Sequence, residues 1–205
     1  AQSCSGGNRW TRSREIEVNV NHKKSTKGHS AYQTSLNQSF MYDPSLPEPS
    51  EDCLNLNIAS PQSASNLPVM IWIHGGAYLT GSANGALYKM DSLVSKGVVL
   101  VTINYRLGPL GFLKLDEVTN GVIPSTGNEG ILDQRLAIKW VKENIEAFGG
   151  NPENITLFGE SAGSWSCALQ VGMGINGDFQ KIICQSGGGD AARSIDSATV
   201  SYTHL

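Results

Sequence analysis

The stretch Asn154-Ile155-Thr156-Leu157-Phe158-Gly159-Glu160-Ser161-Ala162-Gly163 decides the predicted fold. Its first half is an apolar, β-rich run that predicts a strand, and Ser164 to Gln170 predicts a helix directly after it. A Gly-x-Ser-x-Gly pattern at such a strand-to-helix junction is typical of a tight turn that exposes a nucleophilic serine. The pattern alone fits an ordinary turn with a helix-capping serine equally well, because glycine and serine are common residues.

A second motif favours the nucleophile. His74-Gly75-Gly76-Ala77 follows another apolar run, Pro68 to Ile73, upstream of the serine. Two consecutive glycines allow backbone N–H groups to face a substrate carbonyl oxygen. We therefore expect the N–H groups of both glycines, together with that of Ala162, to form an oxyanion hole beside Ser161. Because each motif follows a predicted strand, a merely flexible turn is the weaker interpretation of the glycine pair.

The chain from residue 51 onward has the pattern of a mostly parallel sheet with flanking helices. Continuous apolar runs are typical of strands buried on both faces, and helical stretches lie between them. Apolar residues from Leu132 to Ile145 recur at near-helical spacing, and Gly149-Gly150 is expected to end that helix. The predicted strands are Leu54–Ile58, Pro68–Ile73, Val98–Ile103, Asn154–Phe158 and Gln180–Gln185, and the predicted helices are Asp91–Ser95, 130–148 and Ser164–Gln170.

The two ends of the chain differ in amino-acid composition from this core. Residues 1–50 form a polar lead rich in Ser, Asn, Lys and Gln, in which only Glu15 to Val20 alternates like a short strand. Residues 51–199 are interpreted as a partial core. Residues 200–205 resemble a translated sequencing adapter, so we exclude them from fold reasoning as a non-native tail.

Composition and charge narrow the classes of partner. The 205 residues carry a net charge of −3, so no basic surface for nucleic acid is expected. The longest apolar run of the central region, Val69 to Ile73, is far shorter than the ~18 residues of a membrane-spanning helix. The four cysteines, at positions 4, 53, 167 and 184, have no metal-binding spacing. We expect no metal and no organic cofactor.

Taken together, the motifs resemble those of the type-B carboxylesterase/cholinesterase family of the α/β-hydrolases. The resemblance covers about residues 50–188, and an ordered series of this length does not arise by chance. It is carried by Ser50-Glu51-Asp52-Cys53-Leu54-Asn55-Leu56-Asn57, His74-Gly75-Gly76-Ala77, Asn104-Tyr105-Arg106-Leu107-Gly108, Gly111-Phe112-Leu113, Gly127-Asn128-Glu129-Gly130, Leu132-Asp133-Gln134, Trp140-Val141, Asn144-Ile145, Phe148-Gly149-Gly150-Asn151-Pro152, Phe158-Gly159-Glu160-Ser161-Ala162-Gly163 and Gln185-Ser186-Gly187.

The resemblance implies a truncated α/β-hydrolase fold, and a serine carboxylesterase that hydrolyses small-molecule carboxylic esters through an acyl-enzyme intermediate. Ser161 would be the nucleophile, and the N–H groups of Gly75, Gly76 and Ala162 would stabilise the oxyanion. Glu160 would line the substrate site as a carboxylate near the catalytic base. An acidic residue that interacts with the dipole of the following helix explains Glu160 equally well.

The sequence departs from the family in lacking the rest of the catalytic triad. The family places an acid and a histidine well downstream of the serine, and this chain ends before either. His74 belongs to the glycine turn, His22 and His29 lie in the polar lead, and His204 lies in the excluded tail. We therefore expect this fragment to be inactive and the complete parent to be an esterase. The alternative is a catalytically inactive cholinesterase-like binding or adhesion domain, which the intact Ser161 disfavours.

The family pattern also gives structural expectations. Arg106 and Asp133 would form an ion pair that holds the sheet. The family's partner for Cys53 is missing, so we expect a free buried thiol there, with Cys4 as the alternative disulfide partner. The remaining cysteines are expected to be small core residues, namely Cys167 and Cys184.

The sequence leaves substrate specificity, glycosylation, compartment and oligomeric state open. Tyr42 lies near the place where cholinesterases carry a tryptophan for quaternary ammonium groups, but tyrosine is the weaker partner and choline specificity is not expected. Glycosylation triplets begin at Asn37 and Asn154, and they carry sugar only in a secreted protein. Secretion is common in the family, yet the chain shows no compartment. Its acyl and alcohol preferences and its oligomeric state are equally unknown.

Overall fold

The structure is a computed structural model, and it describes residues 2–15, 28–33, 45–85, 88, 90–174 and 177–189. Several features singled out in the sequence lie outside this described part. They are residues 16–20 of the predicted strand in the lead, His22, the triplet at Asn37, Tyr42, and the tail 200–205 with His204.

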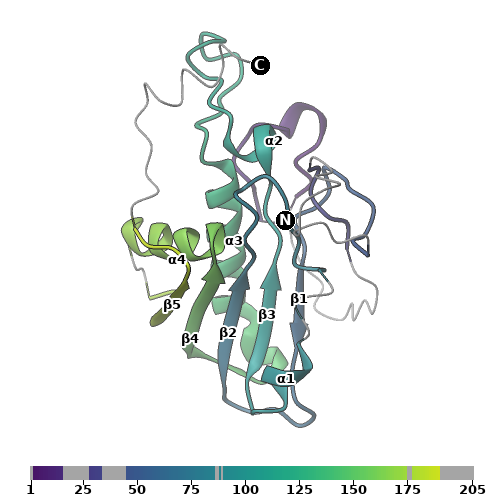
Figure 1. Ribbon diagram of the computed structural model, residues 1–205, viewed down its shortest axis with the longest axis vertical. Helices are drawn as coiled ribbons and strands as arrows, with labels where there is room; N and C mark the ends of the chain where they lie inside the picture. The colour runs from purple at the N-terminus through teal and green to yellow at the C-terminus, as the bar shows by residue number, and fades with distance from the viewer. Residues whose placement is uncertain are drawn as a thin grey trace.

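A five-stranded sheet in the order β1-β3-β2-β4-β5 forms the centre of the molecule (Figure 1). The pairs β3–β2, β2–β4 and β4–β5 are parallel, whereas β1 runs antiparallel to β3. This confirms the predicted mostly parallel sheet, and each strand predicted in the core is present. The strands are β1 Leu56–Ala59, β2 Leu67–Ile73, β3 Val99–Ile103, β4 Gly150–Glu160 and β5 Lys181–Gln185.

The two long helices lie behind the sheet in the view of Figure 1 and contact each other. The helix predicted over 130–148 is α3, Glu129–Asn144, followed by a 3-10 turn, η2, over Ile145–Phe148. Gly149 ends this turn at a φ of +81°, as the Gly149-Gly150 pair predicted. The remaining helices are η1 Gly6–Asn8, α1 Asp91–Val94, α2 Gly108–Phe112 and α4 Ala162–Gly172.

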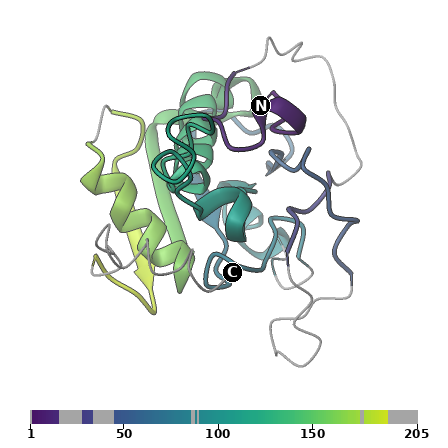
Figure 2. The same cartoon turned by 90° about the horizontal axis from the view of Figure 1, so that it is seen from above.

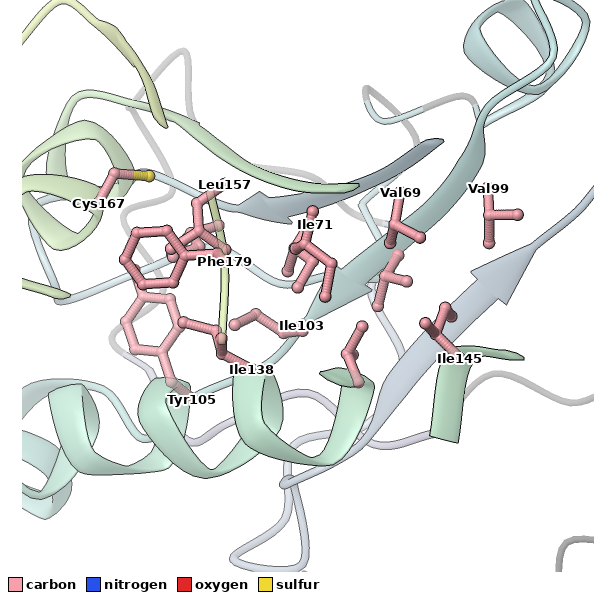
Figure 3. Close-up of a cluster of buried hydrophobic side chains, with 14 of the residues drawn as sticks. Val69, Ile71, Val99, Ile103, Tyr105, Ile138, Ile145, Leu157, Cys167 and Phe179 are labelled. Carbon is pink, nitrogen blue, oxygen red and sulfur yellow. The ribbon is translucent and has the colours of Figure 1, made fainter. Parts of the chain in front are cut away.

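The hydrophobic core fills the space between the sheet and the long helices (Figure 3). Strand β3, which lies between β1 and β2, is buried along its whole length. Ile138 and Ile145 of the α3–η2 segment face the sheet from the opposite layer. The buried Cys167 of α4 belongs to the same cluster, which confirms its predicted place in the core.

The prediction for Cys184 is wrong. Its strand, β5, is exposed at every position, and the Cys184 side chain is exposed with it. Within the described part of the chain, β5 is one of the two edge strands of the sheet and pairs only with β4. An apolar run therefore predicted a strand correctly but could not show that nothing in this part covers it.

The N-terminal segment packs against the core rather than standing apart from it (Figure 2). The Trp10 Nε1–H group donates to the Pro109 carbonyl oxygen at 3.1 Å, and Lys139 of α3 pairs with Glu15 at 2.5 Å. Cys4 is buried in this segment. Cys53 is also buried and free, as predicted, and burial raises the pKa of its thiol to about 12.

Candidate active site

Ser161 stands at the junction of β4 and α4, as the sequence predicted. Its backbone has a φ of +54° and a ψ of −121°, a conformation that non-glycine residues rarely adopt. Such strain persists only where the surrounding structure enforces it, and it concentrates at functional sites. Two hydrogen bonds of its backbone hold it, because the Ser161 N–H donates to the Gln185 carbonyl at 2.9 Å and its carbonyl accepts from the Trp165 N–H at 3.1 Å.

The flanking glycines are required by close packing. A Cβ atom at Gly163 would overlap the Ile73 carbonyl oxygen, and one at Gly159 would lie 2.5 Å from the Gly163 carbonyl carbon. The sharp turn into α4 therefore brings its backbone against the end of β2. This is the physical reason for the small residues on both sides of the serine.

The glycine turn after β2 lies directly beside Ser161. In the sheet, Ile73 at the end of β2 is paired with Gly159, so the two turns leave neighbouring strands at the same level. A Cβ built at Gly75 would lie 3.3 Å from the Ser161 Cβ and 2.7 Å from the Glu160 carbonyl oxygen. The structure thus brings together the serine and the glycine turn that the sequence places 85 residues apart.

Free backbone N–H groups gather at this place. Among the described residues, no hydrogen bond engages the N–H groups of Gly75, Gly76 and Ala162. The Ala77 N–H is equally free, although the sequence motifs do not single it out. The turn carries φ values of +112° at Gly76 and +55° at Ala77, so the chain reverses sharply here. Free donors beside the serine that attacks the carbonyl are what stabilisation of an oxyanion requires.

Several contacts hold the glycine turn in place. The Gly76 carbonyl accepts from the N–H groups of Leu79 and Thr80, at 2.9 and 3.0 Å. The Gln33 side chain makes two hydrogen bonds with the backbone of Gly81, as acceptor at 2.9 Å and as donor at 3.1 Å. The turn is therefore held on its C-terminal side by backbone and side-chain hydrogen bonds.

His74 supports the turn as a buried neutral ring. Its Nδ1–H group donates to the Gly75 carbonyl at 2.8 Å, and its ring stacks on Tyr105 with 4.4 Å between centroids. The Tyr105 hydroxyl in turn donates to the His74 carbonyl at 2.8 Å. Burial lowers the pKa of His74 to about 4. These contacts support the structural role expected for His74 rather than that of a catalytic base.

Glu160 ends β4 and is exposed. Its Oε2 atom lies 3.1 Å from where a Cβ at Gly75 would be. The carboxylate is therefore beside the glycine turn. Both interpretations made for Glu160 are compatible with this place.

The predicted ion pair of Arg106 and Asp133 is present and buried. Arg106 Nε and Nη2 donate to the two carboxylate oxygens of Asp133, each at 2.7 Å. Arg106 Nη1 also donates to the carbonyls of Arg9 and Thr11 at 2.9 Å. Burial lowers the pKa of Arg106, but its hydrogen bond to Asp133 and the charge of that carboxylate outweigh burial, and the pKa is raised. The pair thus joins the end of β3, α3 and the N-terminal segment.

Other classes of site have little support in the described residues. Across residues 28–33, 45–85, 90–174 and the other described ranges, no group of His, Cys, Asp and Glu side chains could hold a metal ion. Within the same ranges, no helix is both long and apolar enough to cross a membrane.

Comparison with protein families and solved structures agrees with this geometry. A model of the carboxylesterase family matches residues 1–204. The chain belongs to the carboxylesterase family. It has the α/β-hydrolase fold of that family, because solved structures similar to it are carboxylesterases.

Individual carboxylesterase relatives are similar over most of the chain. It is 47% identical over 163 residues to a para-nitrobenzyl esterase of Bacillus subtilis, covering 78% of this chain. It is 51% identical over 151 residues to a bile salt-activated lipase of Bos taurus, covering 68%. A solved para-nitrobenzyl esterase superposes with a TM-score of 0.78 at 42% identity over 87% of the chain. A Geobacillus stearothermophilus carboxylesterase gives 0.72 at 46% identity over 78%.

The chain spans only part of these family members. It covers 33% of the Bacillus subtilis esterase and 24% of the bovine lipase. Of the two solved carboxylesterases it covers 36% and 34%.

Proposed function

We propose that the complete protein is a serine hydrolase of carboxylic esters, with Ser161 as the nucleophile. The observation that carries this proposal is the place of Gly75, whose Cβ would lie 3.3 Å from that of Ser161. It puts free backbone donors next to a serine that is half-buried and held in a strained turn. Membership of the carboxylesterase family supports the same conclusion.

In the proposed reaction, the Ser161 oxygen attacks the ester carbonyl carbon, and its proton passes to a base outside this chain. The carbonyl oxygen becomes an oxyanion that accepts hydrogen bonds from the N–H groups of Gly75, Gly76 and Ala162. The C–O bond to the alcohol then breaks, and the alcohol leaves with the proton held by the base. Water attacks the resulting acyl-enzyme, releases the acid and restores the Ser161 hydroxyl.

The free N–H of Ala77 adds a fourth candidate donor to this set. It follows Gly76 in the same reversal of the chain. We infer that the oxyanion is held by the donors of this turn on one side and by the start of α4 on the other. Glu160, beside the glycine turn, would contact the substrate or orient the base.

The substrate class is inferred from the proteins to which the chain is similar. We infer a small carboxylic ester, since the names of the similar proteins are those of an esterase and a lipase. The net charge of −3 gives no support to a nucleic-acid partner. No residue of the proposed reaction needs a metal or an organic cofactor.

The 205-residue polypeptide alone is proposed to be inactive. Of its described histidines, His74 is buried and donates to Gly75, while His29 lies in the lead with its Nδ1 at 3.1 Å from the Glu48 carbonyl. Neither ring forms a hydrogen bond with Ser161 that would let it act as a base. A serine without a base is a weak nucleophile.

Hydrolysis of p-nitrophenyl acetate tests both parts of the proposal. The complete protein is expected to release nitrophenolate, and Ser161→Ala to lower kcat by about 10⁴-fold or more. Ser92→Ala, which removes an exposed hydroxyl from α1, is the matched control and should keep full activity. Equal turnover by the complete protein and its Ser161→Ala variant would contradict the proposed nucleophile and favour a binding domain. Ser161-dependent turnover by the 205-residue chain would contradict its proposed inactivity.

A further inference from the structure

Tyr78 occupies an unusual position in the glycine turn. Its φ of +61° makes it the third consecutive residue of the turn with a positive φ, and it is not a glycine. The Gly108 N–H donates to its carbonyl at 2.7 Å. Its ring packs against Phe112 with centroids 4.7 Å apart and meets Tyr105 edge-on at 6.3 Å. The backbone strain is thus held by contacts on both the main chain and the ring.

The Tyr78 hydroxyl reaches across to the helix that follows Ser161. The Ser166 Oγ–H group of α4 donates to the Tyr78 hydroxyl oxygen at 3.3 Å. Ser166 is completely buried, and it accepts a hydrogen bond at 3.0 Å from the Nε2 group of Gln134 on α3. Gln134 is itself completely buried, and the Gln170 side chain of α4 lies 3.5 Å from its carbonyl oxygen.

This contact connects the two halves of the proposed oxyanion hole. One half is the glycine turn, and the other is the start of α4, where Ala162 lies one helical turn before Ser166. Among the hydrogen bonds of the described residues, the Ser166–Tyr78 bond is the one that joins the turn directly to α4. Because both ends are partly or fully buried, water does not readily replace the bond.

We propose that the Tyr78 hydroxyl is a positioning group, which acts through Ser166 to hold the glycine turn against the start of α4. The inference rests on the proposed function, since it concerns the geometry of that oxyanion hole. Hydrogen-bond donors stabilise a developing oxyanion only when they are fixed before the reaction. Removing the Tyr78 hydroxyl therefore loosens the turn relative to Ser161 but leaves the ring contacts and the fold intact.

Hydrogen exchange tests this link on the 205-residue chain itself. The reporters are the N–H groups of Leu79, Thr80 and Gly108, which are hydrogen-bonded within or to the turn. In Tyr78→Phe these three are expected to exchange about three- to tenfold faster, because one neutral hydrogen bond is lost. The N–H of Leu132, bonded to Asn128 at the start of α3, should be unaffected.

Two further variants provide a second disruption of the bond and a matched control. Ser166→Ala removes the other partner of the bond and should accelerate the same three amides. Tyr32→Phe removes the hydroxyl of a tyrosine that is 51% exposed and should accelerate none. Unchanged exchange in both Tyr78→Phe and Ser166→Ala, with the fold retained, would overturn the proposed link.

Kinetics of the complete protein test the catalytic consequence. Tyr78→Phe is expected to lower kcat for p-nitrophenyl acetate about three- to tenfold and to change KM less than about twofold. The reason is that the bond positions the N–H donors that stabilise the oxyanion of the transition state. The double variant of Tyr78→Phe and Ser166→Ala should lose no more than the stronger single variant, because both remove the same bond. An unchanged kcat, or losses that multiply, would overturn the positioning role.

The two measurements separate this inference from the function on which it rests. Faster exchange in a protein without Ser161-dependent turnover would mean that the link exists and the proposed function fails. Ser161-dependent turnover, with exchange and kcat unchanged in Tyr78→Phe, would mean that the proposed function holds and the positioning role of Tyr78 fails.

Discussion

Single atoms decide whether the turn at Ser161 can form. The clearest case is Gly163, the second residue of α4, where the position of a Cβ is already taken by the Ile73 carbonyl oxygen of β2. At the other end of the same helix, Gly172 has no atom within 4 Å of the position of its Cβ. Two glycines in one helix therefore have opposite tolerance for a methyl group.

Substitution of these two glycines tests this contrast. Gly163→Ala is expected to lower the free energy of unfolding by at least about 2 kcal/mol, because β2 and α4 must move apart. Gly172→Ala should raise it by up to about 1 kcal/mol, since alanine favours the helical backbone. Urea unfolding measures both changes, and equal stability of the two variants would contradict the packing described for the turn.

The buried ring of His74 makes stability depend on pH. Its pKa is lowered to about 4 in the folded protein by burial, against 6.5 for the exposed group. The unfolded chain therefore binds a proton first as the pH falls, and stability is lost between these two values. We expect the free energy of unfolding to fall by about 2 kcal/mol from this group between pH 7.5 and 5.

The control for this prediction is His74→Phe, which keeps an aromatic ring but does not titrate. Urea unfolding at both pH values should show a smaller loss in the variant than in the wild-type chain. An identical pH dependence of the two proteins would mean that His74 is already accessible to protons in the folded state.

At the scale of elements, the Arg106–Asp133 pair connects three parts of the chain. It joins the segment after β3 to α3, and through the carbonyls of Arg9 and Thr11 it fixes the N-terminal segment. Both side chains are almost completely buried, at 3% and 0% exposure. A buried charge that loses its partner is costly, because neither water nor another group replaces the partner.

Asp133→Asn is therefore expected to lower the free energy of unfolding by about 3–5 kcal/mol. The matched control is Glu153→Gln, which removes the charge of an exposed partner of Lys142 and should not change stability measurably. Thermal unfolding of the two variants is the measurement. A Tm of Asp133→Asn equal to that of the wild type would show that the pair is not needed to hold these elements.

The elements were predictable where one local pattern determines them. Strands β2 and β3 and the second half of β4 are rich in apolar residues, and α3 has an apolar stripe that ends before Gly149. Helix α2 was missed because its sequence, Gly108-Pro109-Leu110-Gly111-Phe112, contains two glycines and a proline that locally favour a loop. Cys184 was misplaced because an apolar run does not reveal whether another element covers the strand.

The site was predictable only in part for the same reason. The motifs identified Ser161 and the glycine pair, since the turns they form require glycine. The bond between Tyr78 and Ser166 joins residues 88 positions apart, and no local pattern marks either of them. The free N–H of Ala77 likewise becomes visible only when the turn and its hydrogen bonds are known.

At the scale of the whole molecule, the open edge at β5 is the exposed apolar feature that stands out in the described part. Ile182 and Ile183 are 37% and 45% exposed on this edge strand. Met173 and Val171 at the end of the neighbouring α4 are also exposed. Unpaired strand edges with apolar side chains pair readily with other chains.

The 205-residue chain is therefore expected to self-associate as its concentration rises. Ile183→Lys should shift the population toward the monomer, because a lysine on the edge opposes pairing between strands. Val122→Lys, at a loop residue that is 82% exposed, is the matched control and should not shift it. Size-exclusion chromatography with light scattering measures the mass, and a monomer at all concentrations would contradict the prediction.

The central claim is that Ser161 is an activated nucleophile in the complete protein. The most direct test is labelling of that protein with a fluorophosphonate, followed by mass spectrometry of its peptides. We expect one phosphonyl adduct, on Ser161, that abolishes ester hydrolysis and does not form in Ser161→Ala. A folded complete protein that takes up no label, or carries it on another residue while it hydrolyses esters, would contradict the account.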